Sequence, residues 1–513
     1  MSPPVDTGIV YLVGAGPGDP GLLTVRGRDL LNGCDAIATD ALANPAIVAA
    51  ARLANAGVEI HHVGKRGGSS ESTSQDDINA LLVRLAREGK RVVRLKGGDP
   101  LMFGRGSEEA QALAAAGVRF EMVPGVTSGV AAPAYAGIPV THRGVATSVT
   151  FVTGHEDPSK VDTGTDWAAL ARAGGTIVLY MGVKTLPNIA SALVAGGMSP
   201  DTPAAAIQWG TYTRQRTVVA TVSTLADAIT RAGLGAPVIT VIGKVVALRD
   251  EIAWFDRRPL FGRRVVVTRA SAQASGLRNA LTDMGADVVE MPALRIEPLD
   301  GAPLRAAFDS LDETHWLVFT SQNAVALAWA ALRASGRDAR ALAHCRIACV
   351  GRATSAALLG HGLAADVVPE RFVAEGVLDA MSARDDVKGK RVLYLSALDA
   401  RDVLPKGLRA LGCDVRVVTL YRSVSDGAGA DELRDRLTEG GLDAVIFASA
   451  SAVRGYAEIV GDELARSVPA VSIGPVTSAA IEEAGIFLGA ESEEASVSGL
   501  VEATRRYVMA MGR

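Results

Sequence analysis

The stretch Arg91–Gly106, RVVRLKGGDPLMFGRG, constrains the fold of this chain more than any other. Val92, Val93 and Leu95 predict a buried strand, and Gly97-Gly98-Asp99-Pro100 ends it before a helix that reaches Ala116. Two glycines leave the backbone bare where another molecule can approach, and Asp99 adds an acceptor. Open α/β sheets form their ligand sites in such loops, at the carboxyl ends of strands. An isolated GGDP is equally a plain turn, so its meaning depends on the rest of the chain.

Short apolar segments that end in glycine-rich turns recur over the first 250 residues. They predict strands over residues 9–13, 120–123, 148–153, 176–180, 204–207 and 238–242, and a helix over 75–88. A chain of 513 residues is too long for one hydrophobic core, so we expect several α/β domains.

The first expected strand runs into Gly14-Ala15-Gly16-Pro17-Gly18-Asp19-Pro20, which is similar to a dinucleotide-binding fingerprint. The glycines are spaced G-x-G-x-G, however, and Asp19 takes the third glycine position. Pro17 removes an amide donor, and the Asp19 carboxylate repels a pyrophosphate. The loop therefore favours an adenosyl group joined to a neutral or cationic chain. An NAD-dependent oxidoreductase, with Asp40 as the ribose-binding acid, is the alternative on pattern alone.

Composition excludes several other classes. The net charge of −4 argues against a nucleic-acid binder held by bulk charge. Four scattered cysteines suit a reducing cytoplasm, and we interpret Cys345 and Cys349 as core thiols, so no metal site is expected. Neither a signal peptide nor a membrane-spanning segment is expected, which favours a cytoplasmic protein.

The first half resembles uroporphyrinogen-III C-methyltransferases over about residues 1–250. The resemblance rests, in order, on the segments GAGPGDPGLLT, VGKRGG, RVVRLKGGDPLMFGRG, VPGVTS, YAGIPVTHRG, FVTGH, YMG and VIGKVVALRD. It implies a two-lobed tetrapyrrole-methylase fold, commonly a homodimer, that holds S-adenosyl-L-methionine between its lobes. It also implies double methylation of uroporphyrinogen III to precorrin-2, the entry to sirohaem and cobalamin.

The same resemblance implies the site residues. The cofactor contacts would come from Pro17, Gly97, Gly98, Asp99, Met102, Thr127, Ser128, Met181 and Gly210. Asp40 takes the position of the proton acceptor and Lys65 that of the proton donor, although Thr39 stands where relatives often have tyrosine. A helix N-cap is the alternative role for Asp40.

Basic residues beside glycine turns suit the carboxylates of a tetrapyrrole. The candidates are Arg66, Arg105, His142 and Arg143. Arginine binds carboxylates bidentately, whereas the alternative for each arginine is a solvated surface ion pair.

After an expected short linker over residues 251–262, the chain repeats itself. RVVVTR at Arg264 pairs with RVLYLS at Arg391, WLVFTS at Trp316 with AVIFAS at Ala444, and RIACVG at Arg346 with AVSIGP at Ala470, at separations of 127, 128 and 124 residues. Two copies of one α/β lobe, each with a parallel sheet, are expected. Hydroxyl-rich loops follow the strands at helix starts, where exposed amides bind carboxylates; the alternative is that these hydroxyls only cap helices.

Residues 263–513 resemble uroporphyrinogen-III synthases through VTR, FTSxNAV, VGxxTSxAL, LYRS, FxSxSAV and IGPVTSAA. The resemblance implies two flavodoxin-like lobes joined by a two-stranded ladder, with lobe one over about 263–297 plus 424–513 and lobe two over about 298–423. It implies closure of hydroxymethylbilane with inversion of the last ring. Tyr421 matches a tyrosine that aids departure of the hydroxyl, although a half-buried hinge aromatic is equally plausible on sequence.

The substrate contacts expected in this half are Thr320, Ser321, Ser449 and Thr477. Ser396-Ala397-Leu398 stands where relatives often carry an arginine-glycine turn, so one carboxylate contact is expected to be missing. We interpret the chain as a bifunctional enzyme that makes uroporphyrinogen III and methylates it, with tetrapyrroles as its small-molecule partners. The alternatives are a methyltransferase with an inactive tetrapyrrole-binding second half, and a tetrapyrrole-sensing regulator, for which no DNA-binding element is evident.

Overall fold

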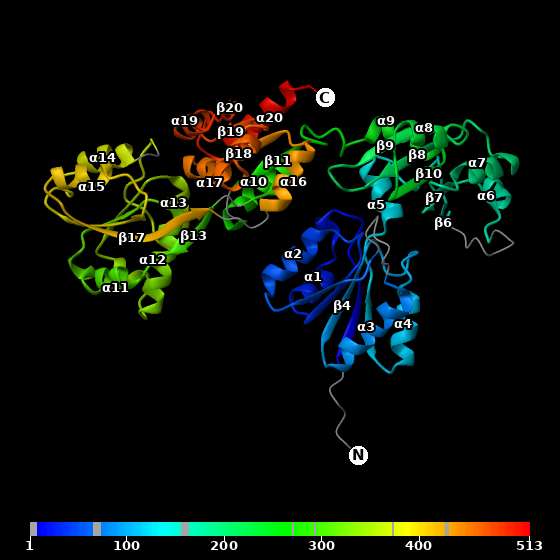
Figure 1. Ribbon diagram of the computed structural model, residues 1–513, viewed down its shortest axis with the longest axis horizontal. Coiled ribbons are helices and arrows are strands. Elements are labelled where there is room, and N and C mark those ends of the chain that lie inside the picture. Colours follow the sequence, from blue (N-terminus) through cyan, green and yellow to red (C-terminus); the bar gives the residue numbers. More distant parts are fainter. Residues whose placement is uncertain are drawn as a thin grey trace, which may run out of the picture. The chain divides into compact units, whose positions relative to one another are not determined.

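A computed structural model describes residues 8–64, 73–154, 164–268, 271–291, 294–371, 374–425 and 430–512. Two compact units make up the chain: the first runs up to Arg263 and includes Thr282–Asp287, and the second comprises Arg264–Leu281 and Val288–Arg513. Within the described ranges each unit holds two five-stranded sheets with helices packed on them (Figure 1). The predicted α/β class is therefore confirmed.

The first sheet is parallel and has the strand order β3-β2-β4-β1-β5. Its strands are β1 (Ile9–Gly14), β2 (Ala36–Thr39), β3 (Glu59–His62), β4 (Arg91–Lys96) and β5 (Arg119–Val123). Its helices are η1 (Pro20–Leu22), α1 (Val25–Asn32), α2 (Pro45–Ala54), α3 (Gln75–Arg87) and α4 (Gly106–Ala115). Because neighbouring strands are parallel, the loops after β1, β4 and β5 leave one edge of the sheet side by side.

Side-chain alternation explains how helices cover both faces of this sheet. Val13 and Val93 pack in a cluster with Leu30 of α1 and Ile47 of α2. Their neighbours in the strands point the other way, into a second cluster with residues of α3 and α4, as Val92 does. Both central strands are consequently buried on both faces, which matches their continuous apolar sequence.

The second sheet is mixed and has the order β6-β7-β10-β8-β9. Its strands are β6 (Val149–Thr153), β7 (Thr176–Tyr180), β8 (Pro203–Gln208), β9 (Arg216–Thr221) and β10 (Val238–Ile242). Its helices are α5 (Ser128–Tyr135), α6 (Trp167–Ala173), α7 (Leu186–Ala195), α8 (Leu225–Arg231), η2 (Lys244–Leu248) and α9 (Arg249–Ile252). Strand β10 is antiparallel to both β7 and β8, so the carboxyl ends of β7 and β8 lie at the same edge. The half-exposed edge strand β9 was not expected from the sequence.

The segment expected to be a tether is packed against α5. Phe255 is buried, and its ring centroid lies 4.8 Å from that of Tyr135 at the end of α5. The Trp254 ring lies 5.1 Å from Tyr135, and its indole N–H donates to the Ala134 carbonyl at 3.0 Å. Arg249 binds both the Ala136 carbonyl and Asp256. Residues 249–256 are therefore part of the first unit's packing.

The second unit has two sheets with matching strand orders, β12-β11-β18-β19-β20 and β13-β17-β16-β14-β15. The strands are β11 (Arg264–Val267), β12 (Asp287–Glu290), β13 (Leu294–Pro298), β14 (Trp316–Phe319), β15 (Arg346–Cys349), β16 (Arg391–Ala397), β17 (Asp414–Ser425), β18 (Ala444–Phe447), β19 (Ala470–Ser472) and β20 (Leu488–Glu491). The helices on the first of these sheets are α10 (Ser271–Asp283), α16 (Ala430–Glu439), α17 (Ala450–Val460), α18 (Asp462–Ala465), α19 (Pro475–Glu483) and α20 (Val497–Ala510). Those on the other are α11 (Ala302–Asp309), η3 (Leu311–Glu313), α12 (Gln322–Ala334), η4 (Ala339–Leu342), α13 (Arg352–Leu359), α14 (Ala374–Ser382) and α15 (Val403–Ala410).

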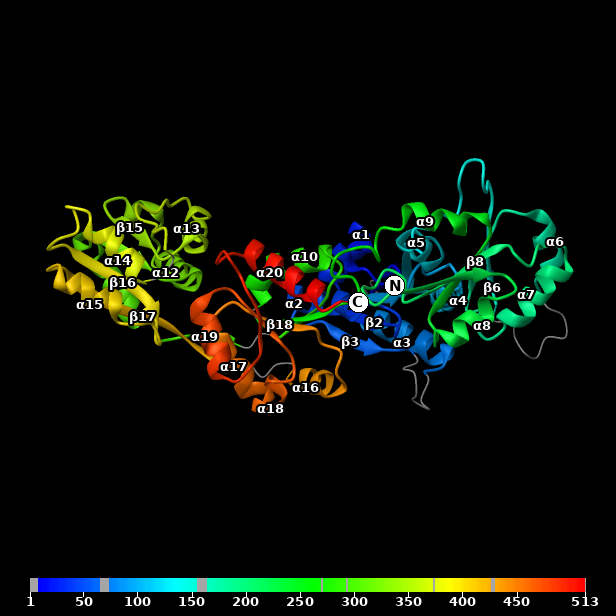
Figure 2. The same cartoon turned by 90° about the horizontal axis from the view of Figure 1, so that it is seen from above.

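Each of these two sheets contains strands from both copies of the sequence repeat. Strand β11 corresponds to β16, β18 to β14 and β19 to β15, and each set of three lies in the same order in its sheet. The lobes are built alike, as expected, but each takes strands from both copies of the repeat. The chain changes lobe through β13 and the long strand β17, which pair antiparallel from Leu294 opposite Ser425 to Pro298 opposite Tyr421 (Figure 2).

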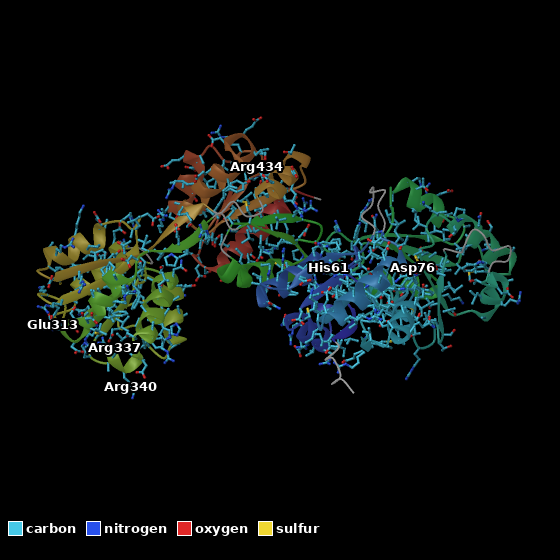
Figure 3. The ribbon with its side chains drawn as sticks, turned by 60° about the horizontal axis from the view of Figure 1, so that its bottom comes forward. His61, Asp76, Glu313, Arg337, Arg340 and Arg434 are labelled. Atoms are coloured by element: carbon cyan, nitrogen blue, oxygen red, sulfur yellow. The ribbon has the colours of Figure 1, made fainter. Side chains whose placement is uncertain are left out.

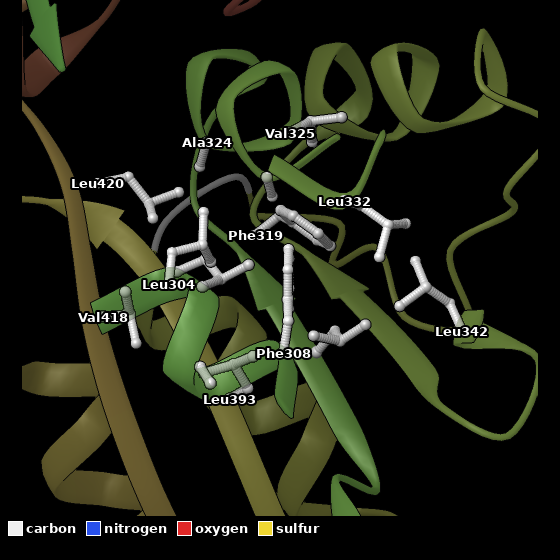
Figure 4. Packing of buried hydrophobic residues seen from close by; sticks show 14 of the residues in the cluster. Leu304, Phe308, Phe319, Ala324, Val325, Leu332, Leu342, Leu393, Val418 and Leu420 are labelled. Carbon is white, nitrogen blue, oxygen red and sulfur yellow. The ribbon is translucent and has the colours of Figure 1, made fainter. Parts of the chain in front are cut away.

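The core of the lobe around β14 shows how these sheets are held. Phe308 of α11, Phe319 of β14, Leu393 of β16 and Val418 of β17 pack in one cluster (Figure 4). Cys349 lies in the same cluster, and burial raises the pKa of its thiol to about 12, in keeping with a core cysteine. Charged side chains such as Glu313 and Arg340 pair at the surface of this lobe, with Arg391 and Asp338 respectively (Figure 3).

Among the described residues, no helix combines the length and apolar content needed to cross a bilayer.

Candidate active sites

Three bare loops meet at the carboxyl edge of the first sheet. The amide of Gly98 donates to the Gly16 carbonyl at 2.8 Å, and the Gly16 amide donates back to Gly98 at 3.2 Å. A Cβ on Gly14 would lie 2.5 Å from the Gly125 Cα, closer than any real contact. Gly98 has a φ of +70°, which favours glycine. Gly14 and Gly125 are thus needed because backbone packs directly on backbone, and Gly98 because of its left-handed conformation.

Asp99 holds two of these loops in place. Its Oδ1 accepts from the amides of Leu101 at 2.8 Å and Met102 at 3.2 Å, and its Oδ2 accepts from the Gly125 amide at 3.0 Å. An ionised carboxylate has about four acceptor positions, so this anchor still has capacity for a ligand hydroxyl. Asp99 is half-buried at the site rather than closed inside the protein.

Strained backbone marks the same region. Five residues other than glycine have left-handed φ angles in the described ranges: Phe103, Arg105, Met181, Trp209 and Thr211. All follow the carboxyl ends of β4, β7 or β8. Each such conformation costs on the order of 1 kcal/mol or more and persists where surrounding contacts demand it, commonly at ligand sites. Met181 combines a φ of +53° with a residue exposure of 54%, as expected of a side chain held out toward a ligand.

Helix α5 brings the loops of the two sheets together. The Thr127 hydroxyl, at its N-cap, lies 2.5 Å from the Tyr180 hydroxyl at the end of β7. A Cβ on Gly210 would lie 2.3 Å from the Ala132 Cβ in the middle of the helix. The expected cofactor contacts at Thr127, Ser128, Met181 and Gly210 are therefore gathered around one helix.

The loop carrying Pro17 closes the arrangement. The Asp19 amide donates to the Thr211 hydroxyl at 3.0 Å, and the Tyr135 hydroxyl donates to Asp19 Oδ2 at 2.7 Å. Burial, with Asp19 beside it, raises the pKa of the Tyr135 phenol. The charged members of the set, Asp19 and Asp99, are both anionic. These hydrogen-bond acceptors fit a cofactor that has a positive centre and hydroxyl groups. They do not fit a pyrophosphate, which is itself negatively charged.

Asp40 lies at the exposed end of a buried charge network. Its Oδ1 accepts from the Arg94 guanidinium at 2.6 Å, and Arg94 is 2% exposed. Arg94 also donates to Glu109 at 3.0 Å, and the Lys96 ammonium donates to Glu109 at 2.9 Å. Burial and the neighbouring Arg94 lower the pKa of Lys96. The N-cap of α2 is Asn44, so the capping alternative for Asp40 does not apply.

In the second unit, Tyr421 and Ser321 come together. Their hydroxyls lie 2.8 Å apart, Tyr421 is 5% exposed, and Ser321 also accepts from the Ala324 amide at 3.1 Å as the N-cap of α12. Ser449 caps α17 in the same way, through the Ala452 amide at 3.2 Å. The sequence repeat thus places equivalent serines at equivalent helix starts.

The other two hydroxyls expected to bind substrate in this unit, those of Thr320 and Thr477, are not placed as helix caps like Ser321 and Ser449. Thr320 donates to the Leu395 carbonyl at 3.2 Å, and Thr477 is 4% exposed. Helices α13 and α19 begin after Gly351 and Gly474 without a side-chain cap in the part of the chain that the structure describes. The first amides of α13 are the better carboxylate donors, because the amides of α12 and α17 already have serine partners. In α19 only the Val476 amide is comparable, since Pro475 has no N–H and the Thr477 and Ser478 amides donate to the Gly474 carbonyl at 3.0 Å. Leu398, where relatives often carry a charged turn, is 60% exposed.

Known proteins with similar sequences cover both units. A family model described as tetrapyrrole (corrin/porphyrin) methylases matches residues 9–226, and one described as uroporphyrinogen-III synthase HemD matches 275–502. The porphyrin biosynthesis protein HemD of Ruminiclostridium josui is 35% identical over 484 residues, covering 93% of this chain and 94% of that protein. The uroporphyrinogen-III C-methyltransferase of Bacillus subtilis is 44% identical, covering 65% of this chain and 68% of that protein. The S-adenosyl-L-methionine-dependent uroporphyrinogen III methyltransferase of Methanosarcina barkeri is 52% identical, covering 47% and 94%.

The chain is a fusion of the tetrapyrrole methylase and uroporphyrinogen-III synthase families. Both resemblances stated from the sequence are confirmed, and the first unit is hereafter the methylase unit and the second the synthase unit. The NAD-dependent oxidoreductase is thereby set aside.

The basic residues expected to bind substrate differ in their surroundings. Arg105 makes a bidentate ion pair with Glu108 at 2.9 and 2.6 Å, and this bond lowers the pKa of Glu108. His142 and Arg143 are exposed on a turn closed by hydrogen bonds between His142 and Ala146. Neither makes an ion pair within the described ranges. Lys65 and Arg66 lie outside the described residues.

Sequence reasoning missed the residues behind the methylase site. Arg94, Lys96 and Glu109 were not assigned, although charges inside an otherwise apolar strand are a usable signal, because a buried charge needs a partner. Tyr135 and Tyr180 were also missed, and nothing in their local sequence indicates that their hydroxyls reach the cofactor loops.

Proposed function

We propose that this protein cyclises hydroxymethylbilane to uroporphyrinogen III in its synthase unit and methylates that product twice to precorrin-2 in its methylase unit. The observation that carries the proposal is the gathering of bare glycine turns and strained residues at the sheet edges of the methylase unit, beside the ion-paired Asp40. Two relatives support it by name: a porphyrin biosynthesis protein HemD that aligns with 93% of the chain, and a uroporphyrinogen-III C-methyltransferase that aligns with 65% of it.

We propose S-adenosyl-L-methionine as the cofactor, held by Pro17, Gly97, Gly98, Asp99, Met102, Thr127, Ser128, Met181 and Gly210. When bound, it supplies a methyl group on a cationic sulfonium. The residues of the chain then have two tasks: to hold the acceptor carbon in line with that methyl group, and to exclude water from it. Asp99 has acceptor capacity for a ribose hydroxyl, as its contacts allow.

Asp40 acts as the proton acceptor in this proposal. A pyrrole ring that gains a methyl group on one of its carbons becomes cationic, and the macrocycle must lose a proton. Arg94 orients the Asp40 carboxylate through Oδ1, which leaves Oδ2 to take the proton. General-base assistance of this kind contributes about 10²–10⁴ in rate. Lys65 is proposed as the proton donor, and Arg66, His142 and Arg143 as donors to the substrate carboxylates. Arg105 is proposed as the weakest contact of this group, because Glu108 already pairs with its guanidinium.

In the synthase unit, Tyr421 is proposed to donate a hydrogen bond to the departing hydroxyl of the linear substrate. Loss of that hydroxyl as water leaves an electrophilic chain end that closes onto the substituted carbon of the last ring. Either hydroxyl can donate in the hydrogen bond between Ser321 and Tyr421, and with Ser321 as the donor the phenolic proton is left for a ligand. Thr320, Ser449, Thr477 and the amides at the starts of α13 and α19 are proposed to receive carboxylates.

The experiment that tests both activities supplies hydroxymethylbilane with and without S-adenosyl-L-methionine, and separates the oxidised products by isomer and mass. The expected result is isomer III without the cofactor and a dimethylated product with it. Isomer I alone, from spontaneous closure, would contradict the synthase activity and favour a methyltransferase with an inactive second half. The hydroxyls already used in capping, and Leu398, are the observations that favour this second candidate.

We further propose that the protein works in the cytoplasm as a homodimer through its methylase unit, without nucleic acid or membrane. Light scattering of the purified full chain tests the dimer. A mass of one chain at micromolar concentration would contradict it.

A further inference from the structure

We infer that Tyr180 is a positioning residue that sets the geometry of the cofactor pocket of the methylase unit. The inference rests on the proposed cofactor and goes beyond it, because Tyr180 is not among the residues expected to touch that cofactor. Tyr180 ends β7 and is 7% exposed.

The Tyr180 hydroxyl serves as the missing cap of α5. Thr127 is the N-cap of this helix, but its side chain makes no hydrogen bond to the helix's own amides. The Gly129 amide instead donates to the Tyr180 oxygen at 2.7 Å, and the same oxygen lies 2.5 Å from the Thr127 hydroxyl. A helix start normally takes such a partner from its own N-cap side chain. Here the partner comes from another strand, so β7 fixes where α5 begins.

Glycine at position 129 is part of this arrangement. A Cβ on Gly129 would lie 2.3 Å from the Tyr180 hydroxyl oxygen and 2.7 Å from its ring. The close approach therefore requires a residue without a side chain at position 129.

Tyr180 also joins two further loops of the pocket. Phe103 has a φ of +54°, follows the proposed contact Met102, and packs its ring centroid 4.9 Å from that of Tyr180. Met181 is the next residue in the chain and has a φ of +53°. Tyr180 is thus linked to three of the loops proposed to hold the cofactor. Its side chain contacts the loops of Thr127 and Phe103, and Met181 follows it in the chain. Strained conformations at Phe103 and Met181 persist only when neighbours hold them, and Tyr180 is the neighbour that they share.

The experiment compares wild type with Tyr180→Phe, which keeps the ring against Phe103 and removes only the hydroxyl. We expect the Kd for S-adenosylhomocysteine, measured by calorimetry on the full chain, to rise at least about fivefold, because two hydrogen bonds that place the pocket are lost. The KM for S-adenosyl-L-methionine is expected to rise by a similar factor, while the KM for uroporphyrinogen III stays within about twofold. A purely structural role would lower the melting temperature without this split between the two substrates.

Tyr11→Phe is the matched control. Tyr11 is buried at 8% exposure in β1 of the same unit, and its hydroxyl makes no hydrogen bond in the part of the chain that is described. Thr127→Val removes the other end of the same bond, and in combination with Tyr180→Phe it should weaken binding less than the product of the two single effects. Equal binding by wild type and Tyr180→Phe would overturn the inference. Failure of wild type itself to bind S-adenosylhomocysteine would instead overturn the proposed cofactor, and this inference with it.

Discussion

The Asp40 carboxylate lies 2.6 Å from the guanidinium of Arg94, and this ion pair connects a partly exposed acid to a network buried inside the first sheet. Behind Arg94, Glu109 is fully buried and receives hydrogen bonds from both Arg94 and Lys96. Two cations and two carboxylates balance, which is what allows these charges to lie in the protein interior. The orientation of the Asp40 carboxylate is consequently fixed by Arg94, which is itself held inside the protein.

Replacing Asp40 by asparagine tests its role as the proton acceptor. Asp40→Asn keeps the shape of the side chain but removes the basic oxygen, so kcat for methylation should fall about 10²–10⁴-fold. The Kd for S-adenosylhomocysteine should stay within about twofold, since Asp40 is not among the proposed cofactor contacts. Asp29→Asn, an exposed change on α1, is the control for loss of one negative charge. Full methylation by Asp40→Asn would remove its proposed role.

Removing Arg94 tests the buried network through stability. Arg94→Met leaves the buried Glu109 with one cation fewer, and should lower the free energy of unfolding by about 3–5 kcal/mol. The double variant Arg94→Met with Glu109→Gln removes the stranded charge, so it should be more stable than Arg94→Met alone. Urea unfolding of the full chain, followed by a probe in the methylase unit, measures both. Equal loss in the two variants would mean that the Arg94–Glu109 pair is not coupled.

Sequence patterns predicted the strands and loops that form the sites, because a buried strand ending in glycines is a local signal. The stretches around Gly98 and Gly16 are such cases, and their loops do meet. The edge strand β9 was missed because only Val218 and Val219 give it apolar character. The repeat alone did not show the exchange of strands between the two lobes of the synthase unit, because a repeat identifies equivalent strands but not the sheet that each joins. Only the lobe bounds implied by the resemblance to synthases carried that information.

Side-chain contacts were predicted less well than the backbone turns, for a physical reason. The left-handed φ of Arg105 and its pairing with Glu108 depend on how β4 passes into α4, which spacing alone does not show. Likewise, the contact between Tyr135 and Asp19 joins residues far apart in the sequence, and no local pattern links them.

Two arginines expected to bind substrate should behave differently. Arg143 is exposed on its turn without an ion pair in the described ranges, so Arg143→Ala should raise the KM for uroporphyrinogen III about fivefold or more. Arg105 is neutralised by Glu108, so Arg105→Asn should change that KM by less than twofold; asparagine tolerates the left-handed backbone there. Steady-state methylation with uroporphyrinogen III as the varied substrate distinguishes the two, and the reverse order of effects would contradict the assignment.

Tyr421 and Ser321 share a hydrogen bond, and their separate roles can be resolved by comparing rate with stability. Tyr421→Phe removes the proposed donor to the leaving hydroxyl, so the rate of uroporphyrinogen III formation should fall at least about tenfold, while the free energy of unfolding changes by about 1 kcal/mol or less. Ser321→Ala removes both the cap of α12 and the partner of Tyr421, so it should lose about 1 kcal/mol of stability in addition to part of the rate. Ser496→Ala removes an equivalent cap from α20 and is the matched control, since Ser496 accepts from the Gly499 amide at 3.0 Å.

If Ser496→Ala slowed the reaction as much as Ser321→Ala, the rate loss would belong to the helix caps and not to the tyrosine. If Tyr421→Phe kept the full rate of isomer III formation, hydroxyl departure would need another donor, and the amides at the starts of α13 and α19 would be the next to test.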